Sequence, residues 1–449
     1  LGTIAAGGVV VSIADSFAVD EMRARFAITD PVAVVTSEVA PRTGKVLPMY
    51  EKVASATGAP CIVVDGGADI ALRDFDVPWD SFLGADRVLA TVARPAGAHT
   101  NILFSSGTTG APKAIPWTQT TPIKAAMDGR FHCDIHRDDV VAWPTNLGWM
   151  MGPWLIYAAL LNNAALALFH DAPTTEGFVE FVENAGVTML GLVPSIVSAW
   201  RSRGLLTPGR WTKLRVIAST GEASGPDDYT WLMSVAGDVP VIEYCGGTEI
   251  GGGYITGTVL HPAIPSRFTT PALGLDIVVV GDDGSPADVG EAFLVPPSMG
   301  LSAELVNRDH DDVYFAGTPD GLRRHGDRLE RFDDGTYRAL GRVDDTMNLG
   351  GVKVSSAEIE EVVGAVEGIE EVAAVGVPPE EGGPERLVVF VVAEVGDAPD
   401  VARLSEEVRQ AVRSRLNPLF RVHDVVLVDA LPRTASHKVM RRLLRDGYR

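Results

Sequence analysis

Residues 214–244 read LRVIASTGEASGPDDYTWLMSVAGDVPVIEY, and this segment decides the fold class. Two short runs rich in β-branched residues, LRVIAS and VPVIEY, enclose a stretch of helix length. A strand, a helix and a second strand in this order form the unit from which parallel sheets are built. The segment therefore predicts layered α/β structure with mostly parallel sheets.

The same alternation extends from residue 1 to about 340. Further runs that we interpret as strands are VVVSI, AVVTS, CIVVD, RVLATV, NILFS, DVVAW, ALALF and TMLGLV. Between about 255 and 340 the pattern changes, because LDIVVVGDDGSPADVGEAFLV and RLERFDDGTYRAL each read as strand, DDG turn, strand. We predict a large multi-sheet α/β domain with a small antiparallel β part.

The pattern changes again after GRVDDTMNLGGVKV. SSAEIEEVVGAV and LSEEVRQAVRSRL are predicted helices, the first with serine at its start and glutamate in its first turns. EVAAVGV, RLVVFVVAEV and HDVVLVDAL are predicted strands. We predict a large domain at residues 1–342 and a small, mobile α+β domain at residues 343–449, joined by one short polar link.

Composition limits the possible partners and location. A formal net charge of -21 repels nucleic acid and anionic membrane surfaces, so small molecules are the expected partners. The three cysteines, Cys61, Cys133 and Cys245, are too few and too scattered for a disulfide framework or a zinc site. Scattered cysteines favour a reducing cytoplasm, and no run approaches the length of a transmembrane helix, so we expect a cytoplasmic protein. The oligomeric state does not follow from the sequence.

The segment SSGTTGAPKAIPW, from Ser105 to Trp117, is a candidate phosphate-binding loop because it follows the apolar run NILF. It lacks the spacing of a Walker loop, in which four residues separate the first glycine from a Gly-Lys pair. What remains is a loop whose backbone N–H groups and hydroxyls can face phosphate oxygens. A plain hydroxyl-rich turn is the alternative.

Three further segments carry chemically useful side chains. In EYCGGTEIGG, Thr248 and Glu249 lie in a glycine turn, where a carboxylate and a hydroxyl suit Mg²⁺, although a surface turn has the same composition. In RRHGDRLE, Asp327 can accept both ribose hydroxyls, with Arg342 near the same sugar, or it only forms a turn. In PRTASHKVMRR, Lys438 precedes a basic helix, and the alternative is a solvated basic tail.

Taken in this order and spacing, the segments resemble the AMP-forming acyl-adenylating superfamily, which includes acyl-CoA synthetases, luciferases and the adenylation domains of peptide synthetases. The likeness covers residues 1 to about 446 and includes STGEASG as the adenine-side loop and GRVDDTMNLGGVKVSSAEIE as the hinge and following helix. Within the superfamily the chain looks closest to the acetyl-CoA synthetase branch. TNLGWMMGPWLIYAALL and MNLGGVKVSSAEIE are similar to plant peroxisomal acyl-activating enzymes.

The resemblance implies an acid–CoA ligase that uses ATP, Mg²⁺ and coenzyme A. A carboxylate attacks the α-phosphorus of ATP to give acyl-AMP and pyrophosphate, and the thiol of coenzyme A then displaces AMP. In both steps negative charge grows on oxygen, so placed donors and cations assist. By position, the resemblance assigns the β- and γ-phosphates to Ser105, Ser106, Gly107, Thr108, Thr109, Gly110 and Lys113, and the adenine to Gly221, Glu222 and Ala223.

The resemblance also assigns the remaining roles. Asp327 and Arg342 would hold the ribose, Thr248 the α-phosphate and Glu249 the Mg²⁺. Lys438 would bridge the carboxylate and the α-phosphate as the catalytic lysine. Rotation of the small domain about the hinge residue Asp344 would then replace Lys438 with the Lys353 side of that domain.

The acyl pocket allows an inference about the substrate. In relatives that use short acids a tryptophan closes the pocket, and the matching position here is Gly246. We therefore expect an acid larger than acetate, of medium chain length or aryl-substituted, in a slot lined by Met150, Met151 and Trp154. The alternative is that Trp149 fills the space.

The chain departs from the family pattern at Ala114, where glycine is usual, at Cys245, where an aromatic residue commonly stacks on adenine, and at His437, where glycine is usual. A histidine with positive φ at position 437 would cost about 1 kcal/mol. The sequence also begins as a helix end running into GGVVVSI, so a preceding segment is expected. Two other functions stay open: loading of a carrier-protein thiol, and nucleotide binding without catalysis.

Overall fold

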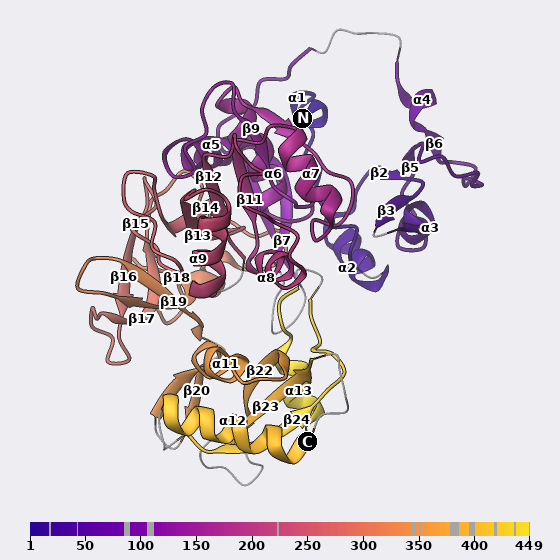
Figure 1. Ribbon diagram of the computed structural model, residues 1–449. Helices are drawn as coiled ribbons and strands as arrows, with labels where there is room; N and C mark the ends of the chain where they lie inside the picture. Colours follow the sequence, from indigo (N-terminus) through magenta and orange to yellow (C-terminus); the bar gives the residue numbers. More distant parts are fainter. Residues whose placement is uncertain are drawn as a thin grey trace. The chain divides into compact units, whose positions relative to one another are not determined.

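The computed structural model describes residues 1–449 except 18, 43, 85–89, 106–111, 222–223, 344–345, 350–351, 378–385, 395–399, 417–419, 435–436 and 449. The chain forms two compact units (Figure 1). Unit 1 comprises Leu1–Ile277 and Val295–Arg323, and unit 2 comprises Val278–Leu294 and Arg324–Arg449. Packing thus groups most of the antiparallel strands with the C-terminal part, and the domain boundary at residues 342 and 343 stays a prediction.

The main sheet of unit 1 has seven strands in the order β10-β9-β11-β12-β13-β14-β15. Its first five strands in that order are parallel, and β14 and β15 are antiparallel to their neighbours. The fold-class prediction is thereby confirmed. The bounds are β9 (Val140–Ala142), β10 (Ala165–Ala167), β11 (Met189–Leu192), β12 (Val216–Ser219), β13 (Val241–Gly247), β14 (Gly252–Thr256) and β15 (Thr270–Pro271).

Helices cover both faces of this sheet, which gives three layers (Figure 1). One face packs against α5 (Thr121–Phe131) and α6 (Met151–Leu161). The other packs against α7 (Glu176–Asn184), α8 (Pro194–Arg203) and α9 (Pro226–Val235). Because side chains alternate along a strand, neighbours such as Val241 and Ile242 enter different core clusters.

Smaller sheets complete unit 1. One joins β1 (Val10–Val11), β7 (His99–Ser105) and β8 (Lys113–Thr118), and another joins β2 (Val34–Ser37), β5 (Cys61–Val64) and β6 (Val77–Pro78). A third pairs β3 (Ala40–Arg42) with β4 (Lys45–Leu47). The helices here are α1 (Gly2–Ala5), α2 (Val19–Thr29), α3 (Met49–Ala54), α4 (Trp79–Phe82) and α10 (His310–Tyr314).

One predicted strand, RVLATV at residues 87–92, is wrong in the part that the structure describes. Residues 87–89 lie outside the described residues, and residues 90–92 are not in a strand. Residues 90–97 are exposed, so the apolar run does not reflect burial. No helix in the described part of the chain combines the length and apolarity needed to cross a membrane.

Unit 2 contains most of a four-stranded sheet in the order β16-β17-β18-β19, which agrees with the predicted antiparallel part. Its strands are β16 (Asp276–Val280), β17 (Val289–Val295), β18 (Arg323–Arg331) and β19 (Tyr337–Arg342), with β18 and β19 antiparallel. The hairpin of β20 (Thr346–Leu349) and β21 (Val352–Ser355) follows.

The C-terminal part of unit 2 matches the predicted helices and strands. A sheet of β22 (Ile369–Val377), β23 (Arg386–Ala393) and β24 (Val422–Leu427) is accompanied by α11 (Ser356–Gly364), α12 (Val401–Arg415) and α13 (Arg441–Gly447) (Figure 1). Val389 of β23 lies in one core cluster with residues of α11 and α12. Its neighbours Val388 and Phe390 share the other cluster with Leu444 of α13. The helices therefore cover both faces.

A buried network fixes the loop between β5 and β6. Asp76 accepts hydrogen bonds from Tyr50 Oη at 2.6 Å, Arg73 Nε at 2.7 Å and Cys61 N at 2.7 Å. Arg73 also donates to the carbonyl oxygens of Thr57 and Ala59 at 2.8 and 3.0 Å. Burial alone would raise the pKa of Asp76, but these hydrogen bonds outweigh it and lower the pKa from 3.8 to about 2.

The Asp76 network predicts a pH-dependent contribution to stability. Because the folded-state pKa lies below the unfolded-state pKa, the carboxylate stabilises the fold by about 2 kcal/mol above roughly pH 5. This contribution is lost as the pH falls toward 2. Urea unfolding should show that Asp76→Asn is destabilised most at pH 7 and progressively less toward pH 3. Asp74→Asn, an exposed neighbour, serves as the control, and a penalty independent of pH would contradict the prediction.

Candidate active site

The two ends of the predicted phosphate loop lie side by side. Ser105 ends β7, Lys113 begins β8, and the two residues are paired in the antiparallel register. Ser105 Oγ is buried and has no hydrogen-bond partner among the described residues. Such an orphan hydroxyl needs an explanation, and an oxygen of a bound anion supplies one. The rest of the predicted loop, Ser106, Gly107, Thr108, Thr109 and Gly110, lies outside the described residues.

Asn307 holds the backbone on both sides of Lys113. Its Nδ2 donates to the carbonyl oxygen of Pro112 at 2.9 Å, and its Oδ1 accepts from the N–H of Ala114 at 3.0 Å. The N–H of Val306 donates to the carbonyl oxygen of Ala114 at 3.0 Å. These bonds fix the start of β8, and therefore the position from which the Lys113 side chain extends.

Lys113 and Arg323 share one aromatic ring. Lys113 Nζ lies 5.1 Å from the centre of the Tyr314 ring, and Arg323 Cζ lies 4.1 Å from it. Tyr314 and Arg323 are 3% and 1% exposed, so the contact belongs to the interior of unit 1. Both distances are within the range of cation–π attraction.

Thr248 and Glu249 occupy the turn between β13 and β14, and neighbouring elements hold its backbone. Trp117 Nε1 donates to the carbonyl oxygen of Thr248 at 2.8 Å. The carbonyl oxygen of Glu249 accepts from Ser302 N at 2.8 Å and from Arg323 Nη1 at 3.2 Å. These bonds fix the backbone of the turn.

The Glu249 side chain lies over Gly247. Glu249 is 9% exposed, and a Cβ added to Gly247 would come within 2.9 Å of Glu249 Oε2. The described residues contain no group of three or more metal-ligating side chains. Mg²⁺ is usually held by one or two carboxylates together with substrate phosphates, so a single buried carboxylate beside a hydroxyl fits that ion.

A buried polar network connects α5 to the two strands that flank this turn. Lys124 and Asp128 of α5 form an ion pair at 2.5 Å with side chains 1% and 0% exposed. Asp128 Oδ2 also accepts from Tyr244 Oη at 2.6 Å and from Gly253 N at 2.8 Å. Tyr244 and Gly253 flank the Thr248–Glu249 turn, so Asp128 joins its two strands.

The predicted adenine side is described in part. Gly221 follows β12 and has a φ of +96°, while Glu222 and Ala223 lie outside the described residues. Ser224 donates to Oε1 of the buried Glu243. Burial raises the pKa of Glu243 to about 7 although the bond from Ser224 opposes the shift. Cys245, at the expected stacking position, lies 3.6 Å from the hydroxyl of Tyr254.

The predicted acyl-pocket residues lie around the start of α6 and the end of β13. Met151 is 7% exposed, and Met150 packs against the same core cluster. Trp154 is fully buried between Trp143 and Tyr244, with ring centres 5.5 and 5.6 Å apart. Trp154 is therefore part of the core.

The packing of β13 against β14 requires glycine at position 246, which the sequence does not reveal. A Cβ at this position would lie 2.0 Å from the carbonyl oxygen of Gly252, so glycine permits the close approach of β13 and β14. Any larger residue here would require β14 to move. Trp149 packs edge-on against Phe17 at 5.1 Å.

In unit 2, Asp327 of β18 and Arg342 of β19 are paired in the antiparallel register. His325 Nε2 lies 3.1 Å from Asp327 Oδ2, and both side chains are largely buried. The predicted hinge residue Asp344 lies outside the described residues. The register thus brings together the two residues predicted to hold the ribose.

Lys438 lies in a tight loop of unit 2. Thr434 N donates to the carbonyl oxygen of Lys438 at 2.8 Å, and Lys438 N donates to Thr434 Oγ1 at 3.1 Å. His437 has a φ of +62°, as the resemblance predicts for this position, and its carbonyl oxygen accepts from Arg433 Nη1 at 2.6 Å. Histidine is among the residues enriched in this conformation.

An ion pair fixes the helix that follows Lys438. Arg441 Nη2 lies 2.8 Å from each carboxylate oxygen of Glu360, and the two side chains are 14% and 17% exposed. Glu360 also accepts from Ala374 N at 2.8 Å. The start of α13 is thereby tied to α11 and β22, which limits the movement of the loop relative to its own unit.

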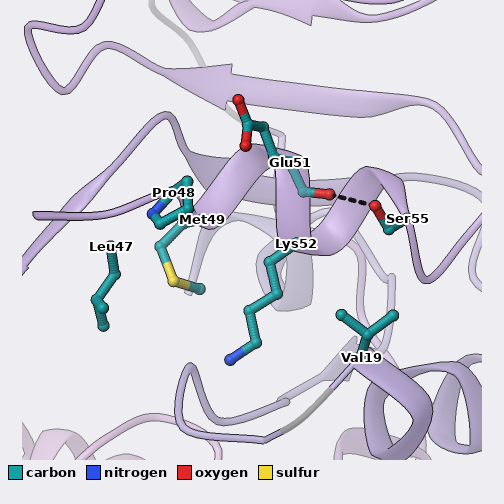
Figure 2. A pocket seen from close by; sticks show the side chains of 7 residues that line it. All are labelled: Val19, Leu47, Pro48, Met49, Glu51, Lys52 and Ser55. Carbon is teal, nitrogen blue, oxygen red and sulfur yellow. Dashed lines mark hydrogen bonds between the residues drawn. The ribbon is translucent and has the colours of Figure 1, made fainter.

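A separate hollow of about 490 Å³ lies between α2 and α3 (Figure 2). Figure 2 shows the side chains of Met49 and Lys52 on α3 and of Val19 on α2 among those that line this hollow. None of the seven lining residues is a predicted site residue. We therefore assign the site from hydrogen bonds and buried charges, without reference to this hollow.

Sequence reasoning did not identify Asn307, Tyr314 or Arg323. Asn307 contacts Ala114 across 193 residues of sequence, and Arg323 contacts Glu249 across 74, and no local pattern reports such contacts. A weak signal exists in RRHGD: because strand side chains alternate, two consecutive arginines place one guanidinium in the interior. Arg323 is that residue, at 1% exposed, whereas the Arg324 side chain is 40% exposed.

Comparison with known proteins supports the superfamily assignment. Residues 1–293 match the family described as AMP-binding enzyme, and residues 358–438 match the AMP-binding enzyme C-terminal domain. A peroxisomal acyl-activating enzyme of Arabidopsis thaliana is 48% identical over 99% of this chain, which covers 65% of that relative. A hexanoyl-CoA synthase of Cannabis sativa is 46% identical over 100% of this chain, which again covers 65% of the relative.

A solved structure shows the same fold. The acetoacetyl-CoA synthetase of Streptomyces lividans superposes with a TM-score of 0.89 at 27% identity, over 99% of this chain and 71% of that protein. The predicted cytoplasmic location is wrong, because the Arabidopsis thaliana relative is named as a peroxisomal enzyme. The prediction rested on scattered cysteines and the lack of a transmembrane run, and neither feature distinguishes the two compartments.

Proposed function

The chain belongs to the AMP-binding enzyme family, and from this membership we propose that the protein is an AMP-forming acid–CoA ligase. It would join a carboxylic acid to ATP, release pyrophosphate, and pass the acyl group from AMP to coenzyme A. The chain spans about 65% of the length of its curated relatives, so the proposal concerns the protein that contains it.

One observation carries the proposal most strongly. Lys113, at the end of the phosphate loop, and the Thr248–Glu249 turn are joined through the buried Tyr314 and Arg323. An ammonium, a hydroxyl and a carboxylate are thus held on one connected framework in unit 1. This set suits a polyphosphate with its metal ion, because the cation meets phosphate oxygens and the carboxylate meets the metal.

The remaining residues would act at the reacting centre. Lys438 would place its ammonium between the attacking carboxylate and the α-phosphate, where negative charge grows on oxygen. Thr248 would donate its hydroxyl to the α-phosphate, and Asp327 with Arg342 would orient the ribose. Mg²⁺ bound by Glu249 would neutralise charge on the leaving pyrophosphate.

We propose that the acid is larger than acetate. Support comes from the relative named hexanoyl-CoA synthase and from Met150 and Met151, whose flexible side chains adapt to apolar ligands. Acid-dependent pyrophosphate release from ATP and Mg²⁺ should therefore be faster with butyrate, hexanoate, octanoate or phenylacetate than with acetate. We expect kcat/KM to rise at least about tenfold from acetate to the best acid, since each buried methylene contributes roughly 0.8 kcal/mol.

Thioester formation, measured alongside pyrophosphate release, separates the other candidate functions. Thioester formation with coenzyme A supports the ligase, whereas formation only with a carrier-protein thiol would contradict it. ATP binding without pyrophosphate release for any acid would indicate a non-catalytic relative. A preference for acetate over every longer acid would refute the proposed substrate class while leaving the reaction class intact.

A further inference from the structure

Arg323 connects the parts of the candidate site that sequence reasoning treats as separate. We propose that Arg323 is a positioning residue that fixes the Thr248–Glu249 turn relative to Lys113 and so sets the affinity for ATP with Mg²⁺. The inference rests on the proposed function, and it concerns a residue to which the sequence motifs assign no role.

One side of the Arg323 guanidinium holds the turn. Nη1 donates to the carbonyl oxygen of Glu249 at 3.2 Å, and Nη2 donates to Ser302 Oγ at 2.8 Å. Ser302 in turn donates its N–H to the same carbonyl oxygen at 2.8 Å. A planar guanidinium with fixed donors restricts both partners at once, which an ammonium on a flexible stem does not.

Arg323 Cζ lies 4.1 Å from the centre of the Tyr314 ring, over its face. Lys113 Nζ lies 5.1 Å from the centre of the same ring. Asn307, from the segment between Ser302 and Tyr314, clamps the backbone on both sides of Lys113. Residues 302–323 therefore link Lys113 to the Thr248–Glu249 turn. A shift of Arg323 would move the two groups relative to each other.

Stability alone does not explain a charge at this position. Arg323 is 1% exposed, and its Nη1 and Nη2 donate to a carbonyl oxygen and a hydroxyl, which are both uncharged. Its Nε has no partner within the described part of the chain. Burial lowers the pKa of Arg323, with a partial opposing effect from Glu249. Buried charges are weak evidence for stability, because well-packed apolar residues in place of a buried ion pair are often neutral or stabilising.

The test compares Arg323→Met with Arg324→Met in the full-length protein that contains this chain. Arg324 is adjacent, and its half-exposed side chain pairs with Glu291 at 2.8 Å. For Arg323→Met we expect the Kd and the KM for ATP with Mg²⁺ to rise about tenfold, the factor for one lost charge-assisted hydrogen bond. The KM for the acid and the melting temperature should stay close to the wild-type values. Arg323→Lys should recover only part of the affinity.

Arg324→Met should match the wild-type protein in all four measurements. A folded Arg323→Met protein with unchanged ATP affinity would overturn the proposal, as would equal rises in both KM values with a lowered melting temperature. If Arg323→Met does not fold, Ser302→Ala removes one bond of the guanidinium and should raise the KM for ATP about threefold. No rise in that variant also overturns the proposal. A wild-type full-length protein that neither binds ATP nor releases pyrophosphate refutes the proposed function itself.

Discussion

Replacing Lys438 by alanine is expected to lower acid-dependent pyrophosphate release by about 100- to 1000-fold, the usual loss when one preorganised donor to a developing oxyanion is removed. The ammonium is the proposed partner of both the attacking carboxylate and the α-phosphate. Its loss therefore raises the barrier of the first half-reaction and leaves the ground-state binding of ATP largely unchanged. Pre-steady-state release of pyrophosphate measures this step directly.

The fold should survive this substitution because the loop is closed by groups that alanine retains. The N–H and the carbonyl oxygen of Lys438 both bond to Thr434, and Arg433 and Val439 form a bridge across the loop. The ion pair of Arg441 with Glu360 also stays intact. We expect a melting temperature within a few degrees of the wild-type value.

The control measures the second half-reaction. With acyl-AMP supplied, Lys438→Ala should still transfer the acyl group to coenzyme A, because the proposed domain rotation removes Lys438 from that step. Pyrophosphate release at the wild-type rate would show that Lys438 is not the catalytic lysine. A loss of both half-reactions in a protein with a lowered melting temperature would instead point to a structural role for the loop.

Local patterns predicted most of the fold because the spacing of apolar residues along the sequence matches the residues that are buried. Strands such as β12 and β23 consist mainly of consecutive apolar residues, most of them buried, and α12 carries apolar residues at helical spacing. The prediction failed at RVLATV, where an equally apolar run is exposed at residues 90–92. Composition reports the tendency to be buried, and only the neighbouring elements decide whether burial occurs.

The candidate site also contains residues that local patterns predict and residues that they do not. Thr248, Glu249 and the positive φ of His437 follow from short motifs, because a turn constrains residues that are adjacent in sequence. Arg323 and Asn307 act through contacts with Glu249 and Pro112, across 74 and 195 residues. Gly246 also had a second role, since its contact with the carbonyl oxygen of Gly252 depends on a bulge in the strand pairing. Such roles become visible only when the register is known.

The buried ion pair beneath the Thr248–Glu249 turn predicts the largest loss of stability. Asp128→Leu is expected to destabilise the protein by roughly 3–5 kcal/mol, because it leaves a buried charge without its partner. Lys124 is 1% exposed, and its Nζ lies 2.5 Å from Asp128 Oδ1. The same substitution removes the acceptor of Gly253 N and of Tyr244 Oη, which join β14 and β13 to α5.

The double variant Lys124→Met/Asp128→Leu tests whether the unpaired charge causes this loss. It removes both ions and leaves only the two neutral donors unsatisfied, so urea unfolding should show it to be more stable than Asp128→Leu alone by at least about 1 kcal/mol. An exposed pair with the same spacing, Arg403 and Glu407, provides the control. Glu407→Leu should cost less than about 1 kcal/mol, because water screens both charges. If the double variant is as unstable as Asp128→Leu, the hydrogen bonds to Gly253 and Tyr244 are what hold the turn. In that case the ion pair serves mainly to keep Asp128 oriented toward them.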